Sequence, residues 1–103
     1  MRVAWTIPAK HALREVGLNI CKDNPAAAAR VVARVRARVR ELSVLPAVGR
    51  IGRVDRTREL VVTGTPYVVA YAVADREVHI LAVKHAAQNW PEVLEGFGIT
   101  YGG

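Results

Sequence analysis

Side chains that could move protons or hold a phosphate group lie mainly in the second half of this chain. A metal-free ribonuclease needs a base for the 2′-hydroxyl, an acid for the leaving oxygen and cations beside the phosphorane. The imidazole of His85 titrates near neutral pH and follows Lys84 at the end of an apolar run. Four residues could fill those roles, although their spacing does not require it: His85, Glu59, Arg53 and Arg58. The alternative interpretation of His85 is a strand-end side chain that only forms hydrogen bonds.

The histidines and the single cysteine argue against a metal site. His11 is expected on the polar side of the first helix, and His79 and His85 have the same parity on the last strand. At about 3.3 Å per strand residue the last two are about 20 Å apart, too far to share a metal ion. Cys21 excludes an internal disulfide and a cysteine cage, and it is interpreted as a small packing residue beside the apolar helix face. Neither a metal nor a cofactor is expected.

Positive charge is concentrated in the middle of the chain. The net charge is +6, and residues 30–58 contain nine arginines against two acids, a local charge of +7. Arginine suits bidentate contact with phosphate or carboxylate, whereas a solvated helix face is the alternative interpretation. The 103 residues fit one domain, and no apolar run is long enough for a membrane span or a secretory signal, so a cytoplasmic location is expected.

Three strands are predicted in the second half of the chain. The β-branched and aromatic runs at 57–63, 67–74 and 77–85 are separated by short polar or Gly/Pro breaks, which is typical of an antiparallel meander. Such breaks cannot hold a crossover helix. Both faces of the middle run are apolar. Helices of this chain can cover one face, and the other needs a partner, a small second layer or the C-terminal tail.

The first half predicts a short strand at 3–5 followed by a helical hairpin. Thr6 can cap the first helix, with Pro8 in its first turn, and Asn24 with Pro25 begins a second helix that ends before Pro46. The fold class is therefore α+β, with an N-terminal strand and a helical hairpin packed on one face of an antiparallel sheet. The segment 46–56 is not a P-loop and is interpreted as a bend that brings arginines near the open face. One domain is expected at 1–95 and a flexible tail at 96–103.

The order of these blocks resembles the RelE/ParE superfamily, the toxins of bacterial type II toxin–antitoxin systems, also called plasmid-stabilisation proteins. The resemblance runs from Val3 to about Pro91. It is carried by Asp-Asn-Pro-Ala-Ala-Ala at 23–28, Thr-Arg-Glu-Leu-Val-Val at 57–62, and Gly-Thr-Pro-Tyr-Val-Val-x-Tyr at 64–71. It implies a growth-inhibiting toxin with the fold described above.

Within the superfamily, the resemblance favours the ParE-like branch, whose members poison DNA gyrase without cutting nucleic acid. RelE-like members cleave messenger RNA on the ribosome with basic residues on the middle strands. The matching positions here are Glu59, Val61 and Val68, which supply no cation. Ribosome-dependent RNA cleavage is the alternative function, and a non-toxic relic that only binds an antitoxin is the second.

Either branch implies a cognate antitoxin that wraps the toxin. We expect a hetero-oligomer with that antitoxin, or a homodimer of the chain alone, and no membrane partner. An acidic segment that folds on binding could cover the open sheet face and neutralise its arginines. The residues expected to bind antitoxin or target are Arg50, Arg53, Arg56, Arg58, Tyr67, Tyr71, Lys84, His85 and Trp90.

Overall fold

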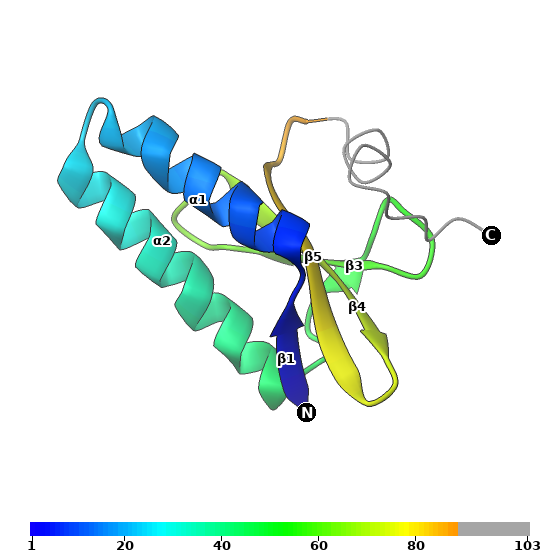
Figure 1. The fold of residues 1–103 in the computed structure, drawn as a ribbon. Coiled ribbons are helices and arrows are strands. Elements are labelled where there is room, and N and C mark those ends of the chain that lie inside the picture. The colour runs from blue at the N-terminus through cyan, green and yellow to red at the C-terminus, as the bar shows by residue number, and fades with distance from the viewer. Residues whose placement is uncertain (89–103) are drawn as a thin grey trace.

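The computed structural model describes residues 1–88 and confirms the α+β class (Figure 1). Two helices pack against a five-stranded sheet. In chain order the elements are β1 (Arg2–Trp5), α1 (Ile7–Cys21), α2 (Pro25–Arg40), the 3-10 turn η1 (Glu41–Ser43), β2 (Arg50–Ile51), β3 (Arg58–Val61), β4 (Tyr67–Ala74) and β5 (Glu77–His85). The expected tail at 96–103, the end of the expected domain at 89–95 and the predicted binding residue Trp90 lie outside the described residues.

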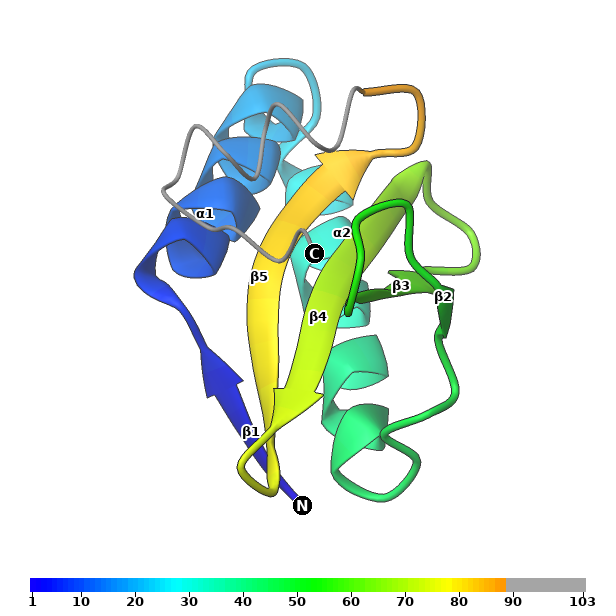
Figure 2. The same ribbon diagram turned by 90° about the vertical axis from the view of Figure 1, so that its right-hand side faces the viewer.

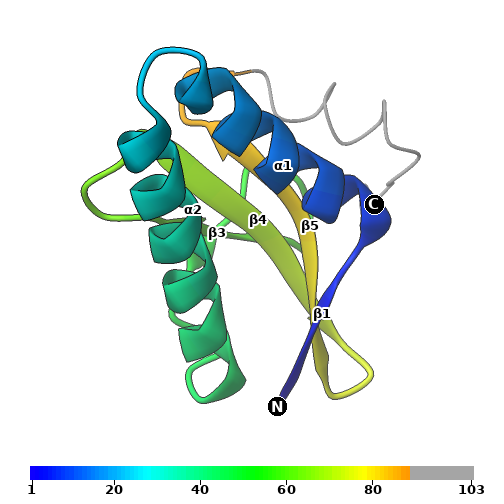
Figure 3. The ribbon, with the colours of Figure 1, turned by 60° about the vertical axis from the view of Figure 1, so that its left-hand side comes forward.

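The helical hairpin forms as predicted, with both expected caps. Thr6 Oγ1 accepts the Ala9 N–H at 3.2 Å, and Asn24 Oδ1 accepts the Ala27 N–H at 3.0 Å. Each cap satisfies a backbone donor that the first helical turn leaves unpaired. The helices approach closely at Gly17, where an added Cβ would lie 3.1 Å from a methyl carbon of Val32. Figure 3 shows the two helices side by side over β4 and β5.

The sheet has the strand order β1-β5-β4-β3-β2, so β5 lies between β1 and β4 (Figure 2). The predicted bounds of β4 and β5 are confirmed, and β3 is shorter than the predicted 57–63. β1 pairs in parallel with β5, for example Val3 with Val78, and the sequence did not predict this pairing. It also did not predict β2, which pairs Arg50 with Glu59 inside the segment interpreted as a bend.

A β-bulge in β5 changes which side chains share a face. Ala70 pairs with Ala82 and Tyr71 with Ile80, so Leu81 is an extra residue between these pairs. Because one extra residue reverses the alternation of side chains, His79 and His85 lie on opposite faces. The prediction that they share a face is wrong.

The main core fills the space between the helices and one face of the sheet. It includes Leu13 and Val16 from α1, Val35 and Val39 from α2, and Tyr71 from β4. The helix residues among them recur at three- and four-residue spacing, so each helix turns one apolar stripe toward the sheet. The same face of the sheet also carries Leu60, Val69, Val78, Ile80 and Val83.

A second, smaller cluster lies on the other face of the sheet. Its members are at most 4% exposed, and Val54 from the loop before β3 packs against them. The cluster consists of Val68, Ala70, Ala72, Leu81 and Ala82. The expectation that this face stays open until another protein docks is therefore wrong, because these side chains are already removed from solvent.

Residues 1–88 contain no helix suited to a membrane span and no cluster of metal-ligating side chains. Neither helix there combines the length and the apolar character that crossing a lipid bilayer requires. Within the same residues, no three histidine, cysteine, aspartate or glutamate side chains lie together as a metal site would need.

Candidate partner-binding site

Glu59 is a buried carboxylate held by two arginines. Its side chain is 2% exposed, and Arg50 Nη2 donates to its Oε1 at 3.0 Å. The backbone N–H of Arg53 donates to Oε2 at 2.8 Å, and Arg53 Nε lies 3.3 Å from Oε1. Because its charge is balanced and both oxygens are engaged, Glu59 fixes the loop after β2 on the sheet.

The neighbouring arginines mostly contact the chain itself. The guanidinium of Arg53 also donates to the carbonyls of Ala86 at 3.1 Å and Gln88 at 3.3 Å. Arg58 Nη1 donates to the carbonyl of Gly49 at 2.7 Å. Arg56 differs: its side chain is 73% exposed, and its ion pair with the exposed Asp55 spans 4.0 Å. Of these three arginines, Arg56 is the one most available to a partner.

Tyr71 is a structural residue, so its predicted binding role is wrong. It is fully buried, and its hydroxyl donates to the Pro46 carbonyl at 2.7 Å. The same oxygen accepts the Gly49 N–H at 2.9 Å. Burial raises the pKa of the phenol above its usual 10.0, and the Gly49 N–H and the charges of Arg58 and Arg38 oppose that shift. Tyr71 therefore ties the loop before β2 to the core.

His85 lies across the sheet from Glu59. It pairs with Tyr67, which packs on the main core, and the two rings meet edge to face with centroids 6.1 Å apart. Glu59 instead pairs with Ala70 of the second cluster. His85 Nδ1 accepts the Ala87 N–H at 3.2 Å, and the ring borders a hollow beside α1.

The four candidate catalytic residues are therefore not brought together. Arg53 and Glu59 are in contact, Arg58 turns to the Gly49 carbonyl, and His85 occupies the other face. Of the remaining expected binding residues, Lys84 is half-buried and pairs with Val68 on the face of Glu59. The predicted surface is thus divided between two faces of the sheet.

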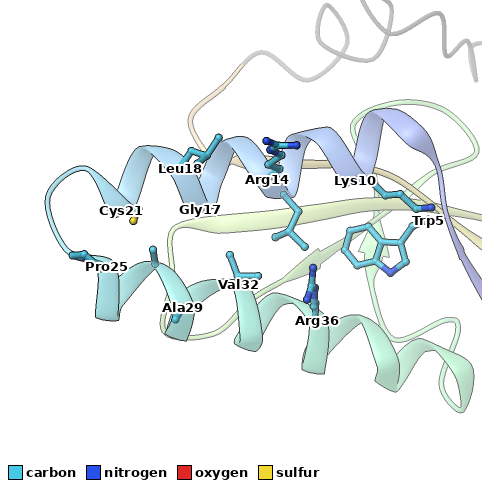
Figure 4. A pocket seen from close by; sticks show the side chains of 12 residues that line it. Trp5, Lys10, Arg14, Gly17, Leu18, Cys21, Pro25, Ala29, Val32 and Arg36 are labelled. Atoms are coloured by element: carbon cyan, nitrogen blue, oxygen red, sulfur yellow. The ribbon is translucent and has the colours of Figure 1, made fainter.

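A different feature of the structure is an apolar groove between α1 and α2 (Figure 4). We call it the hairpin groove, and its volume is about 760 Å³. Lys10 lies next to Trp5 at one end, and Cys21 and Pro25 lie at the other. The groove is lined by Trp5, Lys10, Leu13, Arg14, Gly17, Leu18, Cys21, Pro25, Ala28, Ala29, Val32 and Arg36.

The hairpin groove combines apolar walls with positive charge. Leu18 lines its edge and is 48% exposed, although it is a large aliphatic side chain. The lining residues with charged side chains are Lys10, Arg14 and Arg36, and none is acidic. Such a lining suits an amphipathic helix with apolar residues on one face and acidic residues at its edges.

Sequence reasoning did not find the hairpin groove. The available signal was Leu18, which falls outside the core stripe of its helix and therefore had to face something else. Cys21 gave a second signal. It is exposed and lines the groove, so its interpretation as a small packing residue is wrong.

Comparisons with known proteins give a consistent result. Residues 3–90 match the family model of the ParE toxin of the type II toxin–antitoxin system parDE. A proposed toxin of Sinorhizobium fredii, Y4kP, is 50% identical over 93 residues, which are 90% of this chain and 96% of that protein. Toxin RelE2 of Caulobacter vibrioides is 38% identical over 87 residues, which are 84% of this chain and 97% of that one.

A solved structure supports the fold. A chain from the chromosomal ParDE toxin–antitoxin system of P. aeruginosa superposes with a TM-score of 0.76 at 23% identity, covering 82% of this chain and 95% of that one. The expected superfamily is thereby confirmed, since the family model spans nearly all the residues that carried the resemblance. The chain belongs to the ParE family of toxins of type II toxin–antitoxin systems.

Proposed function

We propose that this toxin stops growth by binding DNA gyrase and that a ParD-type antitoxin neutralises it in a hetero-oligomeric complex. One observation supports a toxin that acts by binding and not by cleavage: Glu59 and His85 lie on opposite faces of the sheet. A cleaving toxin needs an acid and a base on the same phosphate group. In this chain the carboxylate is buried against two arginines, and the imidazole is on the other face.

Ribosome-dependent RNA cleavage is the alternative. It is favoured by the likeness to a protein named RelE2 and by the exposed position of His85. The arginines nearest to Glu59 are engaged within the chain, and Glu59 lies on the other face of the sheet from His85. Within residues 1–88, the hollow beside His85 is lined by a different carboxylate, Glu15 of α1, and by no arginine. This placement favours binding over cleavage.

The target is tested with purified toxin and gyrase. Supercoiling of relaxed plasmid should fall as toxin is added, at micromolar concentration or below, and should recover when antitoxin is added. Toxin that stops growth without affecting supercoiling would contradict the gyrase proposal.

Primer extension on translated messages would then identify a ribonuclease by discrete cuts that His85→Ala abolishes. Unimpaired growth after induction would indicate the non-toxic relic.

For the antitoxin, we propose the hairpin groove as the docking site. The groove offers an unfilled apolar surface, and its three cations complement an acidic helix. The sheet face first expected in this role is already buried. Leu18 is 48% exposed, so covering the rest of its side chain stabilises a complex by about half of the value for a fully exposed leucine, or about 0.8–1.5 kcal/mol.

A matched pair of variants tests the hairpin groove. Leu18→Glu removes an apolar contact and adds a negative charge, so we expect antitoxin affinity to fall at least about tenfold, since 1.4 kcal/mol is tenfold. Leu45→Glu is the control, because Leu45 is 58% exposed and does not line the groove. Calorimetric titration of antitoxin into each variant gives the affinities. Equal affinities for the two variants would show that the antitoxin docks on a different surface.

A further inference from the structure

Helix α2 carries a second charged surface that the proposed function does not use. Its 16 residues include five arginines and no acid. Arg38 is half-buried, pairs with Glu41 and donates to the Val61 carbonyl at 3.2 Å. The other four are exposed, and within residues 1–88 their side chains form no ion pair or hydrogen bond: Arg30, Arg34, Arg36 and Arg40.

Three of these arginines share one face of the helix. At 3.6 residues per turn, Arg30, Arg34 and Arg40 fall within an arc of about 120° that points away from the core. Arg36 falls outside this arc and borders the hairpin groove. The positions between the three are exposed alanines. We call this surface the α2 arginine face; it consists of Arg30, Arg34, Arg40, Ala26, Ala33 and Ala37.

The α2 arginine face borders a hollow of about 590 Å³ between the helix and the segment after β3. Arg30 and Arg34 line it on the helix side, and Val62 and Thr63 line the opposite side. The Arg34 guanidinium extends over the turn, since an added Cβ at Gly64 would lie 3.5 Å from its Cζ. Arg38 and Glu41, which pair with each other, also line the hollow. Within residues 1–88, Arg30 and Arg34 are therefore the cations of this concave surface that have no acid partner.

The chemistry of the α2 arginine face fits a polyanion better than a protein. Arginine is common at the energetic centre of protein interfaces, but it acts there together with buried aromatic anchors such as Trp and Tyr. This face has none, whereas the hairpin groove offers Trp5, Leu18 and Val32. Arginine forks match phosphate oxygens bidentately, and alanines between them let a backbone approach closely.

The spacing fits duplex DNA. At 1.5 Å per residue, Arg30 and Arg34 are about 6 Å apart along the axis and Arg30 and Arg40 about 15 Å. Duplex DNA carries one charge per about 1.7 Å of axis, so several phosphates lie within reach. We propose that the α2 arginine face binds the phosphate backbone of double-stranded DNA. This goes beyond the proposed function, because it requires no gyrase.

Fluorescence anisotropy of the purified full chain with a short labelled duplex tests the proposal. If the face contacts three phosphates, a plot of log affinity against log salt concentration should have a slope of about −2.7. Each phosphate contributes about 0.9 to this slope. The triple variant Arg30→Gln, Arg34→Gln, Arg40→Gln should lose most of that slope and at least about tenfold in affinity at low salt. Glutamine has nearly the helix propensity of arginine, so the helix should persist, which circular dichroism checks.

The control removes the same charge from other surfaces. Arg2→Gln, Lys22→Gln and Arg76→Gln together lower the net charge by three, and all three positions are exposed. An equal loss of affinity in control and triple variant would overturn the proposal, since only net charge would then matter. So would the absence of binding by the unmodified chain. Equally strong competition by poly-L-glutamate at matched charge would point to an acidic peptide instead. Since the assay contains no gyrase, these failures are distinct from failure of the gyrase proposal.

Discussion

Tyr71→Phe is predicted to weaken the fold without weakening partner binding. The substitution removes one oxygen, which donates to Pro46 and accepts from Gly49. Gly49 is buried, so its N–H cannot turn to water, whereas the half-buried Pro46 carbonyl can do so in part. An unsatisfied buried group costs about 1–3 kcal/mol, so we expect a loss of about 2–3 kcal/mol in unfolding free energy. For a domain of this size that lowers the Tm by roughly 10 °C or more.

Urea unfolding followed by circular dichroism measures this loss, and Tyr67→Phe is the matched control. Tyr67 is half-buried, and its hydroxyl forms no hydrogen bond within residues 1–88, so that change should stay within about 0.5 kcal/mol. Antitoxin affinity of the folded Tyr71→Phe variant should equal that of the unmodified chain. Equal stability of the two phenylalanine variants, or a specific loss of antitoxin binding, would refute the structural role of Tyr71.

The unmodified chain and Tyr71→Phe should also differ in how their unfolding free energy depends on pH. Burial raises the pKa of Tyr71 above 10.0, so the folded state holds the phenol proton more tightly than the unfolded state does. The stability from this difference is fully present below pH 10 and is lost as the pH rises through the folded pKa. The unfolding free energies of the unmodified chain and Tyr71→Phe should therefore converge above pH 10 in urea titrations. A constant difference across that range would contradict the assignment.

Two further changes test other parts of the fold. Glu59→Gln removes the charge that holds two arginines, and hydrogen bonds to charged groups contribute about 1.5–3 kcal/mol, so it should cost about 2 kcal/mol in urea unfolding. Glu77→Gln, whose pair with the exposed Arg2 spans 3.5 Å, should cost under about 1 kcal/mol, and equal costs would argue against the role of Glu59. Replacing Asp75 and Arg76 by Asn-Gly should raise stability by about 1 kcal/mol, because both residues have positive φ, at 54° and 60°. A thermal scan measures this, and an unchanged Tm would contradict it.

The elements that sequence reasoning predicted well are those with local signals. Thr6 and Asn24 mark both helix starts through bonds to residues three positions later. The bounds of β4 and β5 follow from apolar runs that end at turn residues. Such features depend on neighbours along the chain and need no knowledge of distant contacts.

The features that were missed depend on distant contacts. The parallel pairing of β1 with β5 joins residues about 75 positions apart, for example Val3 with Val78. The bulge at Leu81 reverses side-chain alternation within an uninterrupted apolar run, so nothing in the composition of β5 reveals it. That one extra residue places His85 on the opposite face from Glu59, so the sequence could not show that the candidate catalytic residues are separated.

The candidate site was only partly predictable for a similar reason. Arg50, Arg53 and Glu59 were named as functional residues, and they do lie together, but as an internal support for the loop after β2. The hairpin groove arises from the angle between two helices, which no single stretch of sequence encodes. Leu18, which lies off the core stripe of α1, and Cys21 were the signals for this groove that the sequence contained.

Growth after induction of His85→Ala tests most directly whether this toxin acts by binding rather than by cleavage. His85 is exposed, so alanine there should leave the fold intact. We predict that, at equal protein level, this variant reduces viable counts to the same extent as the unmodified chain. Full recovery of growth with normally folded His85→Ala, together with loss of message cleavage, would contradict the account.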